Sequence, residues 1–380
     1  MHKKVSALVT SRAQYGRIKL LLEILNNDPA FDLQIITAGS AMLHNYGNIL
    51  DEFTRDGFER VDQLYISVEG GDNIAMAKTT GMAITECTTA FQQFDPDLIL
   101  INGDRFEVLG AAIAAAYTNR IIAHMEGGDV SGTIDESVRH AVTKLSHIHF
   151  VSNEISRQRI LKMGEDPSHT HVVGSVDIEF LNHAPDITDL SFVNEVGVGH
   201  EIDFSSPFTM VMQHPVTTGE DNETHIGSIL NAVEELDIQT IWFWPNIDAG
   251  TGAMSQAIRR FRERNHDPRI RFIVNLLSQQ FINLLRRTSC LVGNSSAGIK
   301  ECSYLGIPVV NIGSRQQGRL RADNVLDTDY DIESIKQGIE SQLNHGVYPL
   351  SSIYYRENTS QTMADILRRA TPSVQKRFLD

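Results

Sequence analysis

The residues best suited to chemistry lie between Ile101 and His140, where acidic side chains follow two strongly apolar segments. The segments at 97–101 and 121–123 show no alternation of apolar and polar residues, so we expect two buried parallel strands. In an open α/β sheet the ligand crevice lies outside the carboxyl ends of the strands, so residues after both strands should face one cleft. The side chains expected there are the carboxylates of Asp104, Glu126, Asp129, Asp135 and Glu136, beside Arg105, His124, Arg139 and His140.

Carboxylates held this close together push their pKa values apart, which allows one to act as an acid and another as a base. We therefore expect this acidic segment to carry out proton transfer on a bound molecule. The alternative is a purely structural segment, in which the acids cap helices and the glycines only turn corners.

The segment from Gly293 to Glu301, GNSSAGIKE, is the strongest local signal in the second half of the chain. A strand runs into Ser295 and Ser296, which open a helix and present N–H groups and hydroxyls to an anion. Glu301 follows about one and a half helical turns later, where its carboxylate is placed to accept hydrogen bonds from both hydroxyls of a ribose. The alternative is a serine N-cap followed by a solvated glutamate.

Other positions after predicted strands suit a phosphorylated ligand. Arg12 lies at the turn between the first strand and its helix, where helix N-terminal amides also favour phosphate, although a surface arginine is the simpler interpretation of this residue alone. His214, Asn246 and Arg315 each follow a later strand. The polar and aromatic loop at 42–47 is also expected near the cleft. The first strand–helix unit lacks the G-x-G-x-x-G fingerprint, so no NAD is expected.

Composition limits the class of protein. The 380 residues suit two domains, and 41% hydrophobic residues suffice for two cores. No apolar run approaches a membrane span, and the N-terminus turns polar too soon for a signal peptide. The three cysteines lack metal-ligand spacing and indicate buried thiols in a reducing cytoplasm. A net charge of -15 argues against general nucleic-acid binding, so a phosphorylated ligand must be held by a few locally gathered basic groups.

Alternating strand and helix patterns occur twice along the chain, with a linker candidate at 184–207. This organisation predicts an α/β fold of two Rossmann-like, doubly wound domains that face each other across a cleft. We expect residues 1–183 to form the domain with the acidic segment and residues 184–355 to form the nucleotide-binding domain. Residues 356–380 should form a C-terminal helix that packs back on the first domain.

Several long motifs, in the same order, resemble the hydrolysing UDP-N-acetylglucosamine 2-epimerases of sialic-acid pathways. They are SRAQYGR, GDRFE, HMEGGDVSGTIDESVRHAVTKLSHIHF, HPVTT, WPNIDAGT, GNSSAGIKE, GSRQQGR and the terminal VQKRF. The resemblance covers nearly the whole chain and implies the GT-B architecture, a UDP-sugar substrate, no redox cofactor or metal, and a homodimer or homotetramer. The sequence departs from the family at Gln14, where an acidic residue is usual, and this concerns a loop contact rather than the chemistry.

The resemblance also implies roles for single residues. The family's catalytic carboxylates fall on Asp104, Glu126 and Asp135. Its nucleotide-binding positions fall on Arg12, Arg105, His214, Asn246, Ser295, Ser296, Glu301 and Arg315. The implied reaction is anti elimination of UDP to 2-acetamidoglucal, followed by syn hydration that yields N-acetylmannosamine for sialic-acid synthesis.

Four alternatives stay open. One is the same reaction on UDP-2,4-diacetamido-2,4,6-trideoxyglucose, which leads to legionaminic acid. Another is a non-hydrolysing epimerase that adds UDP back, which the sequence resembles less. A GT-B glycosyltransferase would use the same nucleotide site, although the dense acidic segment from Glu126 to Glu136 favours elimination over transfer. A nucleotide-sugar sensor would need purely structural carboxylates.

Overall fold

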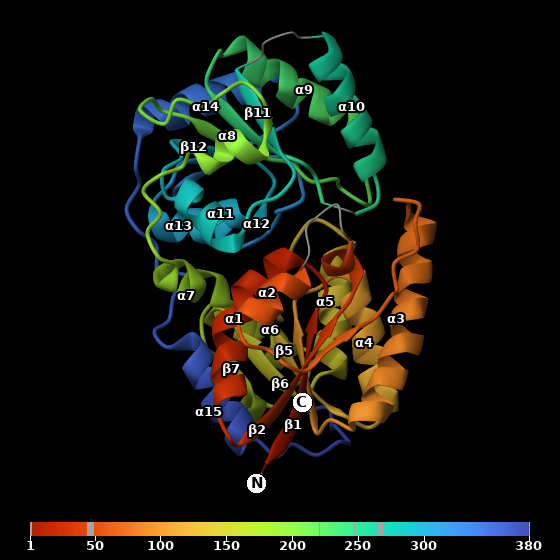
Figure 1. The fold of residues 1–380 in the computed structure, drawn as a ribbon. Helices are drawn as coiled ribbons and strands as arrows, with labels where there is room; N and C mark the ends of the chain where they lie inside the picture. The colour runs from red at the N-terminus through yellow and green to blue at the C-terminus, as the bar shows by residue number, and fades with distance from the viewer. Residues whose placement is uncertain (1, 44–48, 220, 247, 265–268, 380) are drawn as a thin grey trace.

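The computed structural model describes residues 2–43, 49–219, 221–246, 248–264 and 269–379. This described part of the chain forms two mostly parallel sheets flanked by helices, and Figure 1 shows them as two lobes, one above the other. The predicted α/β fold of two doubly wound domains is thereby confirmed. Within the same residues, no helix is both long and apolar enough to cross a membrane.

The first sheet has the strand order β3-β2-β1-β4-β5-β6-β7, and all its strands are parallel. The strands are β1 (Lys3–Val9), β2 (Phe31–Thr37), β3 (Val61–Gln63), β4 (Leu98–Asn102), β5 (Ile121–Met125), β6 (Ile148–Val151) and β7 (Thr170–Val172). Helices cover both faces of this sheet, so every residue of β4 is buried and its sequence is almost wholly apolar.

The helices of the first half pack on the two faces of that sheet. Their bounds are α1 (Arg12–Asn27), α2 (Ile49–Arg55), α3 (Asn73–Phe94), α4 (Phe106–Tyr117), α5 (Ile134–Leu145), α6 (Glu154–Lys162) and α7 (Val176–His183), with short 3-10 turns at Gly39–Met42 and Pro167–His169. Helix α1 contributes to the core on one face, whereas α3, α4 and α5 contribute to the core on the other.

The C-terminal helix α15 (Thr359–Arg369) packs beside α1, from the other end of the chain, as the blue and red ribbons in Figure 1 show. Met363 and Leu367 are buried in the same core as the first strand. The ammonium of Lys3 donates to the carbonyl oxygens of Leu367 (2.7 Å) and Ala370 (2.6 Å). These carbonyls end the helix and lack partners within it, so the lysine completes the docking.

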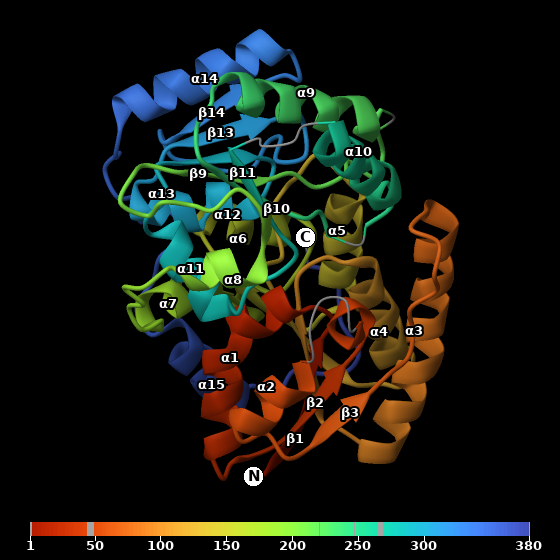
Figure 2. The same cartoon turned by 45° about the horizontal axis from the view of Figure 1, so that its top comes forward.

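The second sheet has the order β14-β13-β12-β9-β10-β11-β8, with only the edge strand β8 antiparallel among the described strands. The strands are β8 (Val198–Gly199), β9 (Thr209–Met212), β10 (Thr240–Phe243), β11 (Ile270–Ile273), β12 (Cys290–Gly293), β13 (Val309–Ile312) and β14 (Val325–Thr328). The helices are α8 (Phe192–Val196), α9 (Asn222–Glu235), α10 (Thr251–Arg264), α11 (Ser278–Leu285), α12 (Ser296–Ile299), α13 (Glu301–Leu305) and α14 (Ile332–His345). Helices α9, α10 and α14 cover one face of this sheet (Figure 2).

The linker candidate at 184–207 contains α8 and β8 and is therefore partly regular. Its residues Leu190, Val193 and Ile202 are buried in a core of the second sheet. The apolar residues are too widely spaced to show a helical or strand period, which is why the segment reads as a connection. The domain boundaries at 183 and 355 stay predictions.

Each sheet reverses the direction of its strand order once, between β1 and β4 in the first and between β9 and β12 in the second. Loops that leave neighbouring strands at such a point run in opposite directions and leave a crevice at the carboxyl ends. The two crevices face each other, because Arg105 after β4 forms an ion pair of 2.9 Å with Asp248 after β10. The fold therefore places both sets of strand-end loops around one space.

Candidate active site between the domains

A cleft of about 320 Å³ lies between the two domains, at the carboxyl ends of both sheets. Its walls come from the loops after β1, β4 and β5 and from the loops after β9, β10, β11, β12 and β13. The predicted site residues that line it are Arg12, Asp104, Arg105, Glu126, Asp135, His214, Asn246, Ser295, Ser296 and Arg315.

Two carboxylates of the first domain differ sharply in their acidity. Asp104, just after β4, forms an ion pair with Arg139 of α5. Burial alone would raise the pKa of Asp104, but the charges of Arg139 and Arg319 outweigh burial and hold the pKa at about 2. Asp135, in the first turn of α5, has its pKa raised to about 6 by burial and by the negative charge of Asp104. At neutral pH one group is firmly ionised while the other is close to titration.

Glu126 follows β5 in a left-handed conformation (φ 66°), which is strained for a residue with a side chain. Its amide donates to the Phe150 carbonyl at 2.9 Å, so pairing with β6 fixes the direction of the residue. The carboxylate forms an ion pair with Lys300 of the second domain and lies 3.4 Å from the Ser175 hydroxyl. Glu126 is therefore held at the boundary between the two domains.

The opposite wall includes the loops after β9 and β12, and Asn294 connects these two loops by hydrogen bonds. Its Oδ1 accepts from the His214 amide at 2.8 Å, and its Nδ2 donates to the His214 carbonyl at 2.9 Å. Arg315 donates to the Asn294 carbonyl at 3.1 Å. Burial and the charge of Arg315 lower the pKa of His214 to about 3, so its imidazole is neutral at physiological pH. The hydroxyls of Ser295 and Ser296 belong to the same wall.

Arg12 and Arg105 line the cleft with their charges already paired to carboxylates. Arg12 forms an ion pair with Glu52 of α2. Arg105 forms ion pairs with Glu107 at 3.1 Å and, across the cleft, with Asp248 at 2.9 Å. An anion that binds here must share or replace these partners, so its contact with either arginine involves an exchange of ion pairs.

Asn246 lies between two residues of this wall. Its amide donates to the Nδ1 atom of His214 at 3.4 Å, and its side-chain Nδ2 donates to Asp248 at 2.5 Å. Asn246 thereby connects the neutral imidazole to the carboxylate that pairs with Arg105. The expected base or phosphate contact of Asn246 stays a prediction.

Glu301 lies in a smaller cavity of about 150 Å³ that adjoins the cleft and is also lined by Phe243 and Phe281. The helix opened by the serines breaks at Lys300, and the break turns Glu301 inward to 3% exposure. This excludes the solvated glutamate considered from sequence. Burial and the charge of Asp177 raise the pKa of Glu301 to about 7. Its Oε2 accepts no hydrogen bond from any described residue, so it can receive one from a ligand.

Sequence reasoning missed three charged residues at the inner end of the cleft. Arg17 forms an ion pair of 3.0 Å with Asp177, and Asp177 forms one of 3.2 Å with Lys300. Arg17 and Lys300 are internal residues of helical segments, so no local pattern distinguishes them from surface cations. Asp177 follows the end of β7, and the rule that selected Asp104 would have selected it as well.

Gln14, where the sequence departs from the family pattern, points into the fold. Its Oε1 accepts from the Thr10 amide at 2.6 Å, and its Nε2 donates to the Asn102 carbonyl at 2.7 Å. The residue thus ties the end of β1 to the end of β4 at the crevice of the first sheet. Most of the loop at 42–47 lies outside the described residues.

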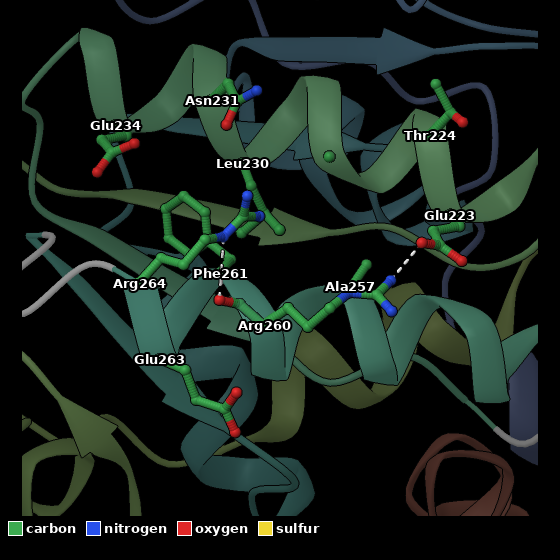
Figure 3. Close-up of a pocket in the computed structure, with 11 residues that line it drawn as sticks. Glu223, Thr224, Leu230, Asn231, Glu234, Ala257, Arg260, Phe261, Glu263 and Arg264 are labelled. Carbon is green, nitrogen blue, oxygen red and sulfur yellow. Dashed lines mark hydrogen bonds and ion pairs between the residues drawn. The ribbon is translucent and has the colours of Figure 1, made fainter.

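A separate hollow of about 620 Å³ lies between α9 and α10. Figure 3 shows Arg260 reaching across it to Glu223, while Arg264 donates to the Arg260 carbonyl at 3.3 Å. None of the residues predicted from sequence lines this hollow. Across the described ranges, no group of three or more histidine, cysteine, aspartate or glutamate side chains is arranged to hold a metal ion.

Comparisons with known proteins agree with this geometry. The family model for UDP-N-acetylglucosamine 2-epimerase matches residues 23–368. The UDP-N-acetylglucosamine 2-epimerase of Neisseria meningitidis is 30% identical, covering 100% of this chain and 99% of that protein. The hydrolysing UDP-N,N'-diacetylbacillosamine 2-epimerase of Legionella pneumophila is 32% identical, covering 97% of this chain and 96% of that protein.

Solved structures extend the comparison to the fold. The Methanocaldococcus jannaschii UDP-GlcNAc 2-epimerase in complex with UDP-GlcNAc and UDP has a TM-score of 0.78 at 17% identity, covering 97% of this chain and 100% of that chain. The S. aureus MnaA–UDP structure has a TM-score of 0.77 at 16% identity, covering 96% of each chain. These matches confirm the predicted GT-B architecture. By the family match and the full-length relatives, the chain belongs to the UDP-N-acetylglucosamine 2-epimerase family.

Proposed function

We propose that this chain is a hydrolysing UDP-N-acetylglucosamine 2-epimerase, which converts UDP-N-acetylglucosamine and water to UDP and N-acetylmannosamine. The observation that carries this proposal is the chemistry of the two facing walls. The first domain offers the carboxylates Asp104, Glu126 and Asp135, and the second offers hydroxyls and an arginine. A nucleotide sugar has the matching polarity, since its diphosphate needs donors and cations while its sugar carbons need acid–base groups.

The second domain would hold the nucleotide. Ser295, Ser296 and Arg315 line the cleft with donors suited to phosphate oxygens. Glu301 has an acceptor oxygen without a partner in the described structure, which supports bonds from the two ribose hydroxyls. The adjoining cavity, which Phe243 and Phe281 help to line, has an apolar wall suited to the flat face of a base.

The first chemical step is the elimination of UDP. A carboxylate takes the proton on C2, the electron pair of the C–H bond forms the C1=C2 double bond, and the C1–O bond breaks with its electrons leaving on the diphosphate. The C2 proton is weakly acidic, so the step depends on stabilising the departing charge. Arg315 and the serine hydroxyls, together with Arg12 and the neutral His214 imidazole, are the groups we assign to this stabilisation.

The second step is hydration of the 2-acetamidoglucal. The oxygen of water bonds to C1 and gives one of its protons to a carboxylate, while a carboxylic acid delivers a proton to C2 from the face opposite to the one that lost it, which inverts the centre. Two faces require two acid–base groups, so we assign the proton transfers to Asp104, Glu126 and Asp135 together. Asp135 is best matched to transfer at neutral pH, because its pKa is raised to about 6 by burial and the charge of Asp104.

The hydrolytic outcome and the assembly are parts of the same proposal. Two relatives whose names specify hydrolysis, from Legionella pneumophila and Campylobacter jejuni, match 97% and 90% of this chain. A relative named for polysialic acid biosynthesis, from Escherichia coli, matches 100% of it at 26% identity. These matches support a role in nonulosonic acid synthesis. We further propose that the protein acts in the cytoplasm as a homodimer or homotetramer.

UDP-2,4-diacetamido-2,4,6-trideoxyglucose is a second candidate substrate. The Legionella relative, which is named for a diacetylated sugar, is 32% identical to this chain, against 30% for the Neisseria relative named for UDP-N-acetylglucosamine. The two identities are nearly equal and both matches span the chain. Both sugars carry the 2-acetamido group at the reacting centre, so one elimination mechanism serves either.

Product analysis tests the proposal. Purified protein is incubated with each UDP-sugar, and products are separated by anion-exchange chromatography and identified by NMR. Free UDP with a 2-epimerised sugar is the expected result, and the faster substrate is the assigned one. UDP-N-acetylmannosamine without free UDP would show the non-hydrolysing reaction. Transfer to an added acceptor without epimerisation would show a glycosyltransferase. No turnover of either sugar would favour a sensor that binds nucleotide sugars without catalysis.

A further inference from the structure

Lys300 is a buried lysine whose ammonium joins the two domains. It lies between α12 and α13, is 1% exposed, and contacts Glu126 and Asp177 of the first domain. Burying an ammonium group costs several kcal/mol unless carboxylates surround it closely. The steps described above use Glu126 but give this cation no part.

The charges around Lys300 are divided in pairs. The Nε atom of Arg17 lies 3.0 Å from Oδ1 of Asp177, and the ammonium of Lys300 lies 3.2 Å from Oδ2 of the same carboxylate. Ser175 connects the two acids, at 3.2 Å from Asp177 and 3.4 Å from Glu126. Because Arg17 already compensates Asp177, the charge of Lys300 is left to compensate Glu126.

Lys300 also ends the helix that the phosphate-facing serines begin. Ser296 opens α12, and Lys300 is the residue at its C-terminal end. A methyl group added at Gly298 would lie 2.9 Å from Val309, so this short helix packs closely on β13. The backbone that bears Lys300 is therefore fixed to the second sheet. The position of its ammonium relative to Glu126 depends on how the two domains are packed against each other.

We propose that Lys300 is a positioning residue, which holds the Glu126 carboxylate in its strained place for proton transfer at C2 when the nucleotide holds the two domains together. The inference rests on the proposed function, since Glu126 acts there on the sugar. Lys300 thereby couples the binding of UDP in the second domain to proton transfer by Glu126 in the first. The amide hydrogen bond to Phe150 fixes the left-handed backbone of Glu126, whereas its carboxylate contacts Lys300 of the second domain and the Ser175 hydroxyl.

The test compares Lys300→Met, which keeps the length of the side chain and removes its charge, with Lys300→Arg, which keeps the charge. The control is Lys336→Met, which removes a lysine that pairs with Glu235 and Glu333 on the surface. For each variant, kcat and KM are measured with the UDP-sugar that the wild type turns over, and UDP affinity is measured by calorimetry. If Lys300→Met does not fold, Lys300→Gln takes its place, because it also removes the charge but keeps a hydrogen-bond donor for the two carboxylates.

We expect Lys300→Met, or Lys300→Gln in its place, to lower kcat by roughly 10²-fold, the cost of a misplaced catalytic group, with KM and UDP affinity within about threefold. Lys300→Arg should recover at least about tenfold of that loss, whereas Lys336→Met should match the wild type. A kcat within about threefold of wild type, no recovery with arginine, or an equal loss of UDP affinity would overturn the inference. A wild type without turnover would instead overturn the proposed function, and the inference with it.

Discussion

Replacing Asp135 by asparagine should strongly lower turnover and, at neutral pH, make the protein more stable. Burial and the charge of Asp104 raise the pKa of Asp135 from 3.8 to about 6 in the folded protein. A carboxyl group with a raised folded pKa favours folding while it is protonated, and this contribution is lost as the pH rises through the folded value of about 6. Above pH 7 the wild type therefore carries the cost of an ionised Asp135, which asparagine lacks.

The size of this cost follows from the shift. One pKa unit corresponds to about 1.4 kcal/mol, so a shift of roughly two units sets an upper value of about 3 kcal/mol. Solvent in the cleft screens part of it, so the free energy of unfolding at about pH 7.5 should rise by about 1–3 kcal/mol in Asp135→Asn. At about pH 5, between the unfolded and folded pKa values, about half of the gain should remain.

Urea unfolding followed by circular dichroism at both pH values measures this effect, and the turnover assay runs beside it. The matched control is Asp323→Asn, which changes an exposed aspartate and should alter stability by less than about 0.5 kcal/mol at either pH. Turnover should fall by about 10²–10⁴-fold in Asp135→Asn, the usual contribution of a positioned acid–base group. A variant that is less stable at pH 7.5, or whose gain is equal at both pH values, would refute the reasoning.

Three further predictions concern the proposed chemistry. Asp104→Asn and Glu126→Gln should each lower turnover by about 10²–10⁴-fold and leave UDP affinity nearly unchanged; full turnover in either would remove that residue from proton transfer. Arg315→Ala and Ser296→Ala should each weaken UDP binding by roughly 1.5–3 kcal/mol in calorimetry, and unchanged affinity would place the residue outside the nucleotide site. In deuterated water the product should carry one deuterium at C2 by NMR, and an unlabelled product would exclude elimination and hydration.

The strands and the loops that bear the site were predictable from the amino-acid sequence because their signals are local. A parallel strand covered on both faces is almost wholly apolar, so the segments 97–101 and 121–123 stand out without any three-dimensional information, and the strands observed there are Leu98–Asn102 and Ile121–Met125. Parallel strands of one sheet end at one edge, so polar residues after different strands can be expected to meet. This reasoning placed Asp104, Glu126 and His214 around a cleft before their partners were known.

Helix breaks and short edge strands were less predictable. The serine-led helix appears continuous in sequence, whereas in the structure it breaks at Lys300, whose ammonium contacts two carboxylates of the other domain. The edge strand β8 has only two residues. A hydrophobic period needs a longer stretch than that to be distinguished from a loop.

The charge states of the site depended on tertiary structure alone. Asp104 and Asp135 are both aspartates at strand and helix ends, yet Arg139 and Arg319 hold one ionised while burial and its neighbour's charge raise the pKa of the other. Lys300 meets Glu126 across 174 positions of the chain. Coulomb energy and desolvation depend on distances in space and on the surrounding dielectric, which no local pattern encodes. The sequence by itself therefore determined which residue types gather at the cleft. Only the tertiary structure decided which of these side chains are protonated and which are ionised.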